Sequence, residues 1–472
     1  MLRRAIAAAA AVAVTAGAGS ATYKQNKRFQ EDGIKQFHRA SFNQPPKGWT
    51  GPVFEPSLDF PRHPPNGKQS YPYPWETIDF KKEPEKYLEA VLNYCFEGNI
   101  ETDFVPRNNK VRKWYHAPWM TQTPFGREPL HGLTFERPAP IGYLGKSQKR
   151  LLQTWAMGMY NEAGGYTLGQ VWTKKYEPTS KPEGHSLKFP NGAVTFKLLF
   201  SQANKHDLPF LDGSPTWKAT IARKPFDDYG GPSVERTEPK DLHLLQVDIA
   251  VRDRRAGDTT GWIFGTFMYH DSVKNESPWK RLMPVCLMWG NDPGLDQKKY
   301  DEGYRPKESW VNPAAIKALE IPHAKRPYLG WLDRGNGPVD NYISSCLSCH
   351  ATANTPRLEL TFKTGKEGNI IDKEERIVLF FRNIAAGDPF GFVGDPLDYS
   401  LQLAAGADSN DDWREHWLEQ QQPKFLSQFF GRGGTEWQRP GPPLSTFPEH
   451  KLAARGIVLS DYSDKEKSEV VQ

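Results

Sequence analysis

The chain has 472 residues, of which 38% are hydrophobic and 25% are charged, a composition typical of a soluble globular protein with a substantial core. The mean hydropathy of -0.68 excludes a polytopic membrane protein, and the 12% aromatic content argues against general disorder. The net charge is only +5 and the basic residues are scattered, so nothing supports nucleic-acid binding. The 40 prolines favour β-structure and long ordered loops over a helical bundle.

Residues 1–21 are expected to be a targeting segment. A basic start is followed by an uncharged, alanine-rich stretch from Ala5 to Tyr23. This pattern is typical of a secretory signal peptide and predicts export, to the periplasm in a bacterium. Because no acidic residue precedes Glu31, import into the mitochondrial intermembrane space stays open as an alternative.

Residues 22–135 are rich in Pro, Trp, Tyr and Phe and contain no long periodic segment. They are expected to form an extended arm that wraps the core, with one helix at Glu83–Tyr94 that has Pro84 in its first turn. A second helix is expected to begin at the N-cap Ser147 and to end at Gly164. Its apolar residues recur at helical spacing: Leu151, Leu152, Trp155 and Met159.

Beyond this point the hydrophobic period changes to two, which is typical of half-buried strands. The expected strands are Ala193–Phe200, Leu244–Arg252, Gly261–Tyr269, Leu282–Trp289 and Arg376–Phe381. Their short links imply an antiparallel sheet, so the predicted fold class is α+β. The expected organisation is a β-rich domain at 136–355, an extension packed on the core at 356–460, and a frayed polar tail at 461–472.

The chemistry is expected at Cys346-Leu347-Ser348-Cys349-His350, the attachment signature of a c-type haem. Two thiols at this spacing reach the two vinyl groups on one haem edge, and His350 then supplies the proximal iron ligand. One motif means one covalent haem. Three other interpretations stay open: a thioredoxin-like disulfide, a structural zinc site, and unrelated buried thiols. The two remaining cysteines, Cys95 and Cys286, are interpreted as buried hydrophobic residues, although a disulfide between them is possible in an oxidising compartment.

An electron carrier usually has a sixth iron ligand, whereas a catalyst or gas binder leaves that position open. Met283 and Met288 lie in an apolar strand, where methionine more often fills the core. His270 precedes Asp271, and either could act as an acid–base group. The full set of candidate ligands is His185, His243, Met268, His270, Met283, Met288 and His323.

Lys197 lies in the middle of a strand, on the face opposite Phe196 and Leu198. It is interpreted either as a solvent-facing lysine on a half-buried sheet or as a lysine that points at the haem. The loop Gly335–Asn341 is interpreted either as a rigid element that leads to the haem edge or as a plain surface turn.

Arginines that could bind the haem propionates follow two of the expected strands. Asp248 and Asp253 could instead pair with these arginines in a structural network. The candidates for the propionates are Arg252, Arg254, Arg255, Arg382 and Asn383.

Three features together resemble the β-sheet cytochromes c-prime (cytochrome c′-β) and their lysine-crosslinked, hydroxylamine-oxidising relatives. They are a strand entered by Phe189-Pro190-Asn191-Gly192 that carries Lys197, a strand with Gly261-Trp262-Ile263-Phe264, and the late haem motif. The resemblance covers about residues 185–355. It implies a small antiparallel sheet packed over one covalent haem whose sixth position is open.

In the resemblance, Cys346 and Cys349 carry the haem, His350 is the proximal ligand, and Lys197 matches the strand lysine. The distal wall would come from Phe196, Phe264 or Phe267. This chain is much longer than a typical member and continues well beyond the motif. It also resembles a group of large, single-haem, exported bacterial proteins, in the segments 137–140, 289–293 and 335–341.

Three functions are therefore compared. The first is a monohaem c-type cytochrome that transfers electrons to a redox partner protein. The second is an oxidoreductase or gas-binding protein that acts on a small nitrogen or oxygen species at an open iron. The third is a haem-bearing accessory subunit of a membrane respiratory complex, for which the arm and the extension would be docking surfaces. The length of the chain favours the second and third over a plain carrier.

Overall fold

The computed structural model describes residues 45–65, 73–118, 127–172, 178–221, 236–355, 380–391 and 394–407. The segment 1–21, predicted to be a targeting segment, and the segment 461–472, predicted to be a polar tail, lie outside these residues. Within the described residues, no helix is both long enough and apolar enough to cross a membrane.

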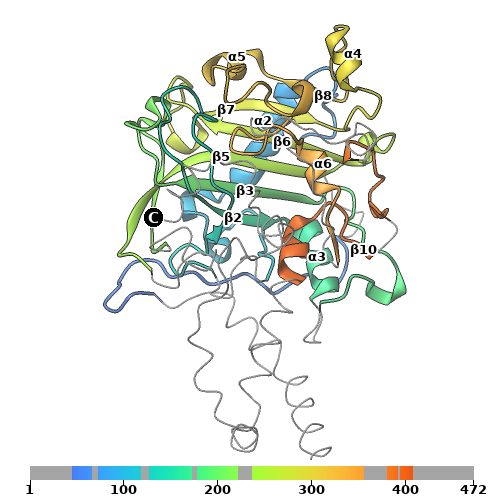
Figure 1. Cartoon of the computed structure of the whole chain (residues 1–472). Helices are drawn as coiled ribbons and strands as arrows, with labels where there is room; N and C mark the ends of the chain where they lie inside the picture. The colour runs from blue at the N-terminus through green and yellow to red at the C-terminus, as the bar shows by residue number, and fades with distance from the viewer. Residues whose placement is uncertain are drawn as a thin grey trace, which may run out of the picture.

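A large antiparallel sheet is the centre of the fold (Figure 1). The strand order is β1-β2-β3-β5-β6-β7-β8, and β4 pairs with β5 beyond the end of β3. The α+β prediction is thus confirmed. The strands are β1 (Thr134–Phe135), β2 (Thr154–Tyr160), β3 (Val194–Ser201), β4 (Thr216–Ala219), β5 (Lys240–Arg252), β6 (Trp262–Tyr269), β7 (Leu282–Met288) and β8 (Ser309–Val311), and a separate pair consists of β9 (Asn354–Thr355) and β10 (Asp395–Pro396).

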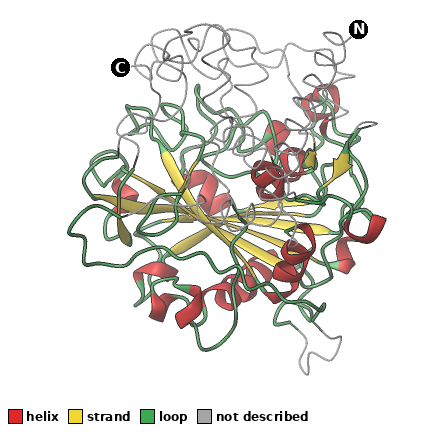
Figure 2. Ribbon diagram, turned by 90° about the horizontal axis from the view of Figure 1, so that it is seen from below, coloured by secondary structure: helices red, strands yellow, loops and turns green. Residues whose placement is uncertain are grey.

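Short helices flank the sheet on both sides (Figure 2). They include α2 (Pro84–Phe96), α3 (Glu162–Val171), α4 (Gln297–Asp301), α5 (Pro313–Ala318) and α6 (Cys346–His350), and residues 401–407 are helical as well. In Figure 1, α2 is visible behind the strands and α6 lies in front of them. The sheet therefore has two different faces, and the motif helix lies on the face opposite α2.

The face toward α2 is the main hydrophobic core. Period-two alternation places Phe196, Val247 and Ile249 on it, packed with α2 residues such as Leu88. Gly265 lets α2 approach closely, since a Cβ there would lie 2.3 Å from Leu88 Cδ2. The predicted helix in the arm is confirmed as α2, which begins at Pro84.

The predicted helix from Ser147 to Gly164 is wrong. Residues 154–160 form β2, which is buried on both faces between β1 and β3, so the apolar residues there serve two sides of a strand. The helix begins only after Asn161, whose side chain accepts a hydrogen bond from the Gly164 amide. Gly165 does not end the helix but lies inside α3, where it packs on Tyr115. A Cβ at position 165 would lie 2.4 Å from the Tyr115 ring, so this close packing requires glycine.

The four central strands are confirmed as β3, β5, β6 and β7, each within a few residues of its predicted bounds. The expected strand Arg376–Phe381 falls mostly outside the described residues, and its last two residues are not in a strand. The described parts of the 356–460 extension pack on the core, where Phe381 stacks on Trp331 with ring centroids 4.6 Å apart.

Candidate functional site

The helix α6 contains only the five residues of the motif and is fixed at its N-terminus by a capping box. The Ser345 hydroxyl accepts a hydrogen bond from the Ser348 amide at 3.0 Å, and the Ser348 hydroxyl accepts one from the Ser345 amide at 2.9 Å. Ser345 also donates to Asn291 Oδ1 at 2.9 Å. A helix this short is not stable alone, so these contacts hold the motif in place.

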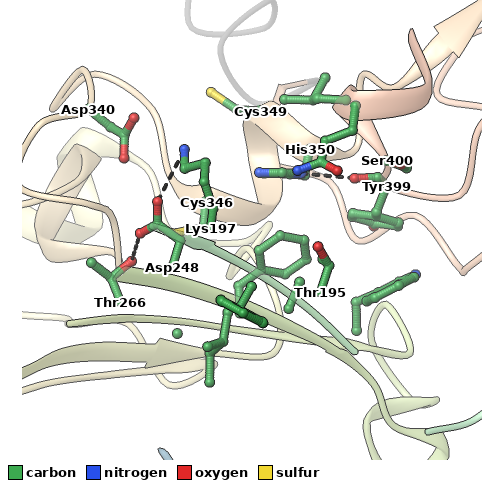
Figure 3. A pocket seen from close by; sticks show the side chains of 18 of the residues that line it. Thr195, Lys197, Asp248, Thr266, Asp340, Cys346, Cys349, His350, Tyr399 and Ser400 are labelled. Carbon is green, nitrogen blue, oxygen red and sulfur yellow. Dashed lines mark hydrogen bonds and ion pairs between the residues drawn. The ribbon is translucent and has the colours of Figure 1, made fainter. Parts of the chain in front are cut away.

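The three chemical side chains of the motif all line one cavity of about 290 Å³ (Figure 3). Cys346, Cys349 and His350 are partly accessible, whereas Leu347 and Ser348 between them are fully buried. The helix therefore presents the two thiols and the imidazole to one space and anchors itself with the other two residues.

His350 is oriented by the segment that follows β10. Its Nδ1 lies 2.8 Å from the backbone oxygen of Tyr399, and because a carbonyl only accepts, Nδ1 must carry the proton (Figure 3). Burial lowers the pKa of His350 to about 4, so the ring is neutral at pH 7 and Nε2 keeps its lone pair. This is the state in which imidazole binds a metal.

On the sheet side of the cavity, polar residues form a row across neighbouring strands. Lys197 of β3 pairs in register with Asp248 of β5, which pairs with Thr266 of β6, which pairs with Cys286 of β7. Directly paired residues lie on the same face, so all four face α6. The Lys197 ammonium lies 3.1 Å from Asp248, and Thr266 donates to Asp248 at 2.9 Å (Figure 3).

Two more carboxyl groups surround the lysine. Glu136 and Asp340 line the same cavity, and burial together with the neighbouring carboxylates raises the pKa of each. Burial lowers the pKa of Lys197, but the carboxylates of Asp248, Glu136 and Asp340 outweigh it and raise that pKa above its ordinary value. Lys197 is therefore a fixed positive charge in the cavity at neutral pH.

The loop Gly335–Asn341, predicted either to approach the site or to be a surface turn, belongs to the site. Asn336, Asp340 and Asn341 line the cavity. The buried guanidinium of Arg326 donates to four backbone oxygens, of Leu329, Gly337, Pro338 and Asp340.

The aromatic residues expected at the distal wall are divided between the two faces of the sheet. Phe264 lines the cavity, and its ring centroid lies 4.5 Å from that of His350. Phe196 also borders the cavity, but its ring packs edge-on against Trp114 in the main core. Phe267 also packs in the core on the α2 side. Successive side chains of a strand point to opposite faces of the sheet. Phe264 and Phe267 are three positions apart on β6, so their rings lie on opposite faces.

The candidate sixth ligands do not reach the cavity. Met288 is buried in the cluster beneath α6, and Met283 packs at the edge of the main core. His270 stacks on Phe210 and hydrogen-bonds to Ser272, away from the motif. Within the described part of the chain, His350 is the sole histidine or methionine that lines the cavity; His185, His243, Met268 and His323 do not.

The candidate arginines for the propionates lie elsewhere too. Arg255 pairs with Asp253 at 2.6 Å, as the structural-network interpretation predicts, whereas Asp248 pairs with Lys197 rather than with an arginine. The arginine that does line the cavity is Arg137. Arg252 and Arg382 donate to backbone oxygens, Asn383 donates to Glu308, and Arg254 is exposed.

All four cysteines are free thiols, and Cys95 and Cys286 are not bonded to each other. Across the described residues, no group of three or more His, Cys, Asp or Glu side chains is arranged to hold a metal ion. Comparison with protein-family models, with curated proteins and with solved structures gives no match for this chain.

Proposed function

We propose that this chain is a monohaem c-type cytochrome, with one haem bound covalently through Cys346 and Cys349 and with His350 as the proximal iron ligand. The observation that carries the proposal is that one cavity contains both thiols and an imidazole whose Nδ1–H is already held by Tyr399. When bound, the haem supplies one-electron redox chemistry at its iron. The proposal also includes export of the chain to the periplasm or to the mitochondrial intermembrane space, and electron transfer between its haem and a redox partner protein.

The lining of the cavity fits such a group. Phe264, Trp262 and Phe189 give it an apolar wall, and Arg137 brings a cation suited to a carboxylate. Gln402 also lines the cavity, and its buried Oε1 has no hydrogen-bond partner in the described part of the chain. A cavity with an unsatisfied polar atom and mostly apolar walls is typical of a ligand site.

The thiols do not fit the main rival interpretation. A thioredoxin-like motif lowers the pKa of its nucleophilic cysteine. Here, hydrogen bonding to Cys286 and burial raise the pKa of Cys346, and burial raises the pKa of Cys349. The motif also follows an irregular segment beside an antiparallel sheet, not a strand of a βαβ unit.

A second candidate, chemistry at an open iron, is favoured by the residues near His350. None of the other described residues lining the cavity is a histidine or methionine, so this lining offers no typical sixth ligand. Asp248 lies 3.1 Å from the Lys197 ammonium, so a hydrogen-bond acceptor and a hydrogen-bond donor stand side by side in the cavity. In this candidate, Lys197 would donate a hydrogen bond to a small nitrogen or oxygen species and Asp248 would accept one from it.

The test is to co-express the chain with haem-maturation machinery and to record optical spectra of the oxidised, reduced and carbon-monoxide-treated protein. We expect haem that survives denaturation, and its loss in the double variant Cys346→Ala/Cys349→Ala but not in Cys95→Ala, a buried cysteine outside the cavity. Absence of covalent haem in the wild type would refute the proposal. A reduced spectrum unchanged by carbon monoxide would favour an electron carrier, and a shifted one would favour the open site.

A further inference from the structure

A third thiol, Cys286, lies beside the motif. It is fully buried in β7, and its register pairing with Thr266 places it on the face of the sheet that carries α6. Cys286 is thus the end of the polar row that begins at Lys197, and it extends that row toward the first cysteine of the motif.

Cys286 and Cys346 share a neighbour, Asn336. The Cys286 thiol donates to the backbone oxygen of Asn336 at 3.3 Å, and the Cys346 sulfur lies 3.9 Å from Oδ1 of the same residue. The two thiols also hydrogen-bond to each other, and this bond is the largest cause of the raised pKa of Cys346. Gly335 lies next to both cysteines, since a Cβ there would lie 3.4 Å from the Cys286 sulfur and its backbone oxygen accepts a hydrogen bond from the Cys346 amide at 3.2 Å.

Cys346 therefore has two possible thiol partners. Cys349 is next to it in the motif, but its own polar contacts are with Ser344 and Ser348 rather than with Cys286. Cys95, the other buried thiol, belongs to the core on the α2 side. A disulfide requires the two sulfurs to approach each other to about 2.05 Å.

We propose that Cys286 and Cys346 form a disulfide in the haem-free protein under oxidising conditions, and that this bond withholds Cys346 from haem attachment until it is reduced. The two S–H bonds break and one S–S bond forms. The two electrons and two protons pass to the disulfide of a thiol-oxidising protein or small molecule, which becomes two thiols. The second part of the proposal rests on the proposed function, since it assumes that Cys346 attaches the haem.

The first experiment uses the full-length haem-free chain, expressed without maturation machinery and oxidised with diamide, a diazene that takes up two electrons and two protons. After the free thiols are blocked, peptides are mapped without reduction. We expect a linked peptide pair containing Cys286 and Cys346 as the main product. It should be lost in Cys286→Ala and retained in Cys95→Ala.

A map with only the Cys346–Cys349 bond, or with Cys286 fully blocked as a free thiol, would overturn the proposal. This result is read from the wild-type chain, so it does not depend on whether a variant folds. Cys286→Ser, which keeps the size of the side chain, repeats the comparison if Cys286→Ala is unstable.

The second experiment separates this proposal from the proposed function. In a Cys349→Ala background the motif disulfide cannot form, so Cys346 can pair only with Cys286 or attach haem. After oxidation and removal of diamide, we expect several-fold less haem attachment than in Cys286→Ala/Cys349→Ala, and recovery on reduction. Equal attachment before and after reduction would refute the withholding of Cys346. Failure of both chains to attach haem even when reduced, with the linked peptide still present, would count against the proposed function alone.

Discussion

Lys197 shows how one residue organises the charge of the site. Asp248, Glu136 and Asp340 surround it, and the side chains of Lys197 and Asp248 are only 27% and 23% exposed. Low exposure weakens solvent screening, so the charges depend on one another more than they would at the surface. The alternation of the strand alone could not decide between a solvent-facing and an inward-facing lysine, because the segments that cover it are remote in sequence.

Replacing Lys197 with alanine is expected to remove the cation that pairs with Asp248 and that also stabilises the charged forms of Glu136 and Asp340. We expect a loss of about 1–3 kcal/mol in the free energy of unfolding at pH 7, measured by urea titration. Lys218→Ala is a matched control, since Lys218 also pairs in register with an aspartate, Asp241, at 3.0 Å, but both are more than half exposed. Its effect should stay below about 1 kcal/mol. Equal effects of the two variants would contradict the role assigned to Lys197.

At the scale of elements, the motif helix depends on its cap. Ser345 closes the capping box and also ties α6 to Asn291. Asn291 in turn accepts a hydrogen bond, through its backbone oxygen, from the buried Arg334. The short helix is therefore positioned by a segment that lies 54 residues before it in the chain, rather than by its own length.

Ser345→Ala is expected to destabilise the chain by about 1–2 kcal/mol and to lower the amount of covalent haem per chain. The control is Asn312→Ala, which removes the N-cap of α5, a helix outside the cavity lining. It should reduce thermal stability similarly but leave the haem content unchanged, as measured by absorbance against protein concentration. A parallel loss of haem in both variants would show that stability alone limits attachment.

The four central strands could be predicted because apolar alternation over seven or more residues is a strong local signal. The failure at 154–160 has a physical cause: a strand buried on both faces carries apolar residues at positions that also fit a helical period. Strands of two to four residues, such as β1 and β8, have too few positions to show any period. Cys346, Cys349 and His350 were predictable from their spacing, whereas Tyr399 and Arg137 reach the cavity through tertiary structure alone.

At the scale of the whole molecule, a buried histidine joins two parts of the N-terminal segment 22–135. His116 accepts a hydrogen bond from the Ser57 amide at Nδ1, at 3.0 Å, and packs edge-on against Phe54. Burial and the neighbouring Arg127 lower the pKa of His116 well below 6.5. Below pH 6.5, His116 is therefore protonated in the unfolded chain but stays neutral in the folded chain until the pH reaches its lowered pKa.

The free energy of unfolding should consequently fall as the pH decreases below 6.5, by up to about 1.4 kcal/mol per pH unit from this histidine. His116→Gln removes the titrating group, so its stability should change less steeply between pH 6.5 and 5 than that of the wild type. His206→Gln, at an exposed histidine, should leave the slope unchanged. Chemical unfolding at several pH values measures both slopes, and identical slopes for wild type and His116→Gln would disprove the assignment.

The polar row from Lys197 to Cys286 takes one residue from each of β3, β5, β6 and β7. A single hairpin contains only two of these four residues. The row is complete only when β3 has paired with β5 and β5, β6 and β7 have paired with one another. Pairing of strands that are distant in sequence is a slow step of folding. Every strand of the row precedes the motif in the chain. During vectorial synthesis or translocation, these strands can thus pair before Cys346 emerges. The Cys346 thiol would then pack on a sheet that is already folded.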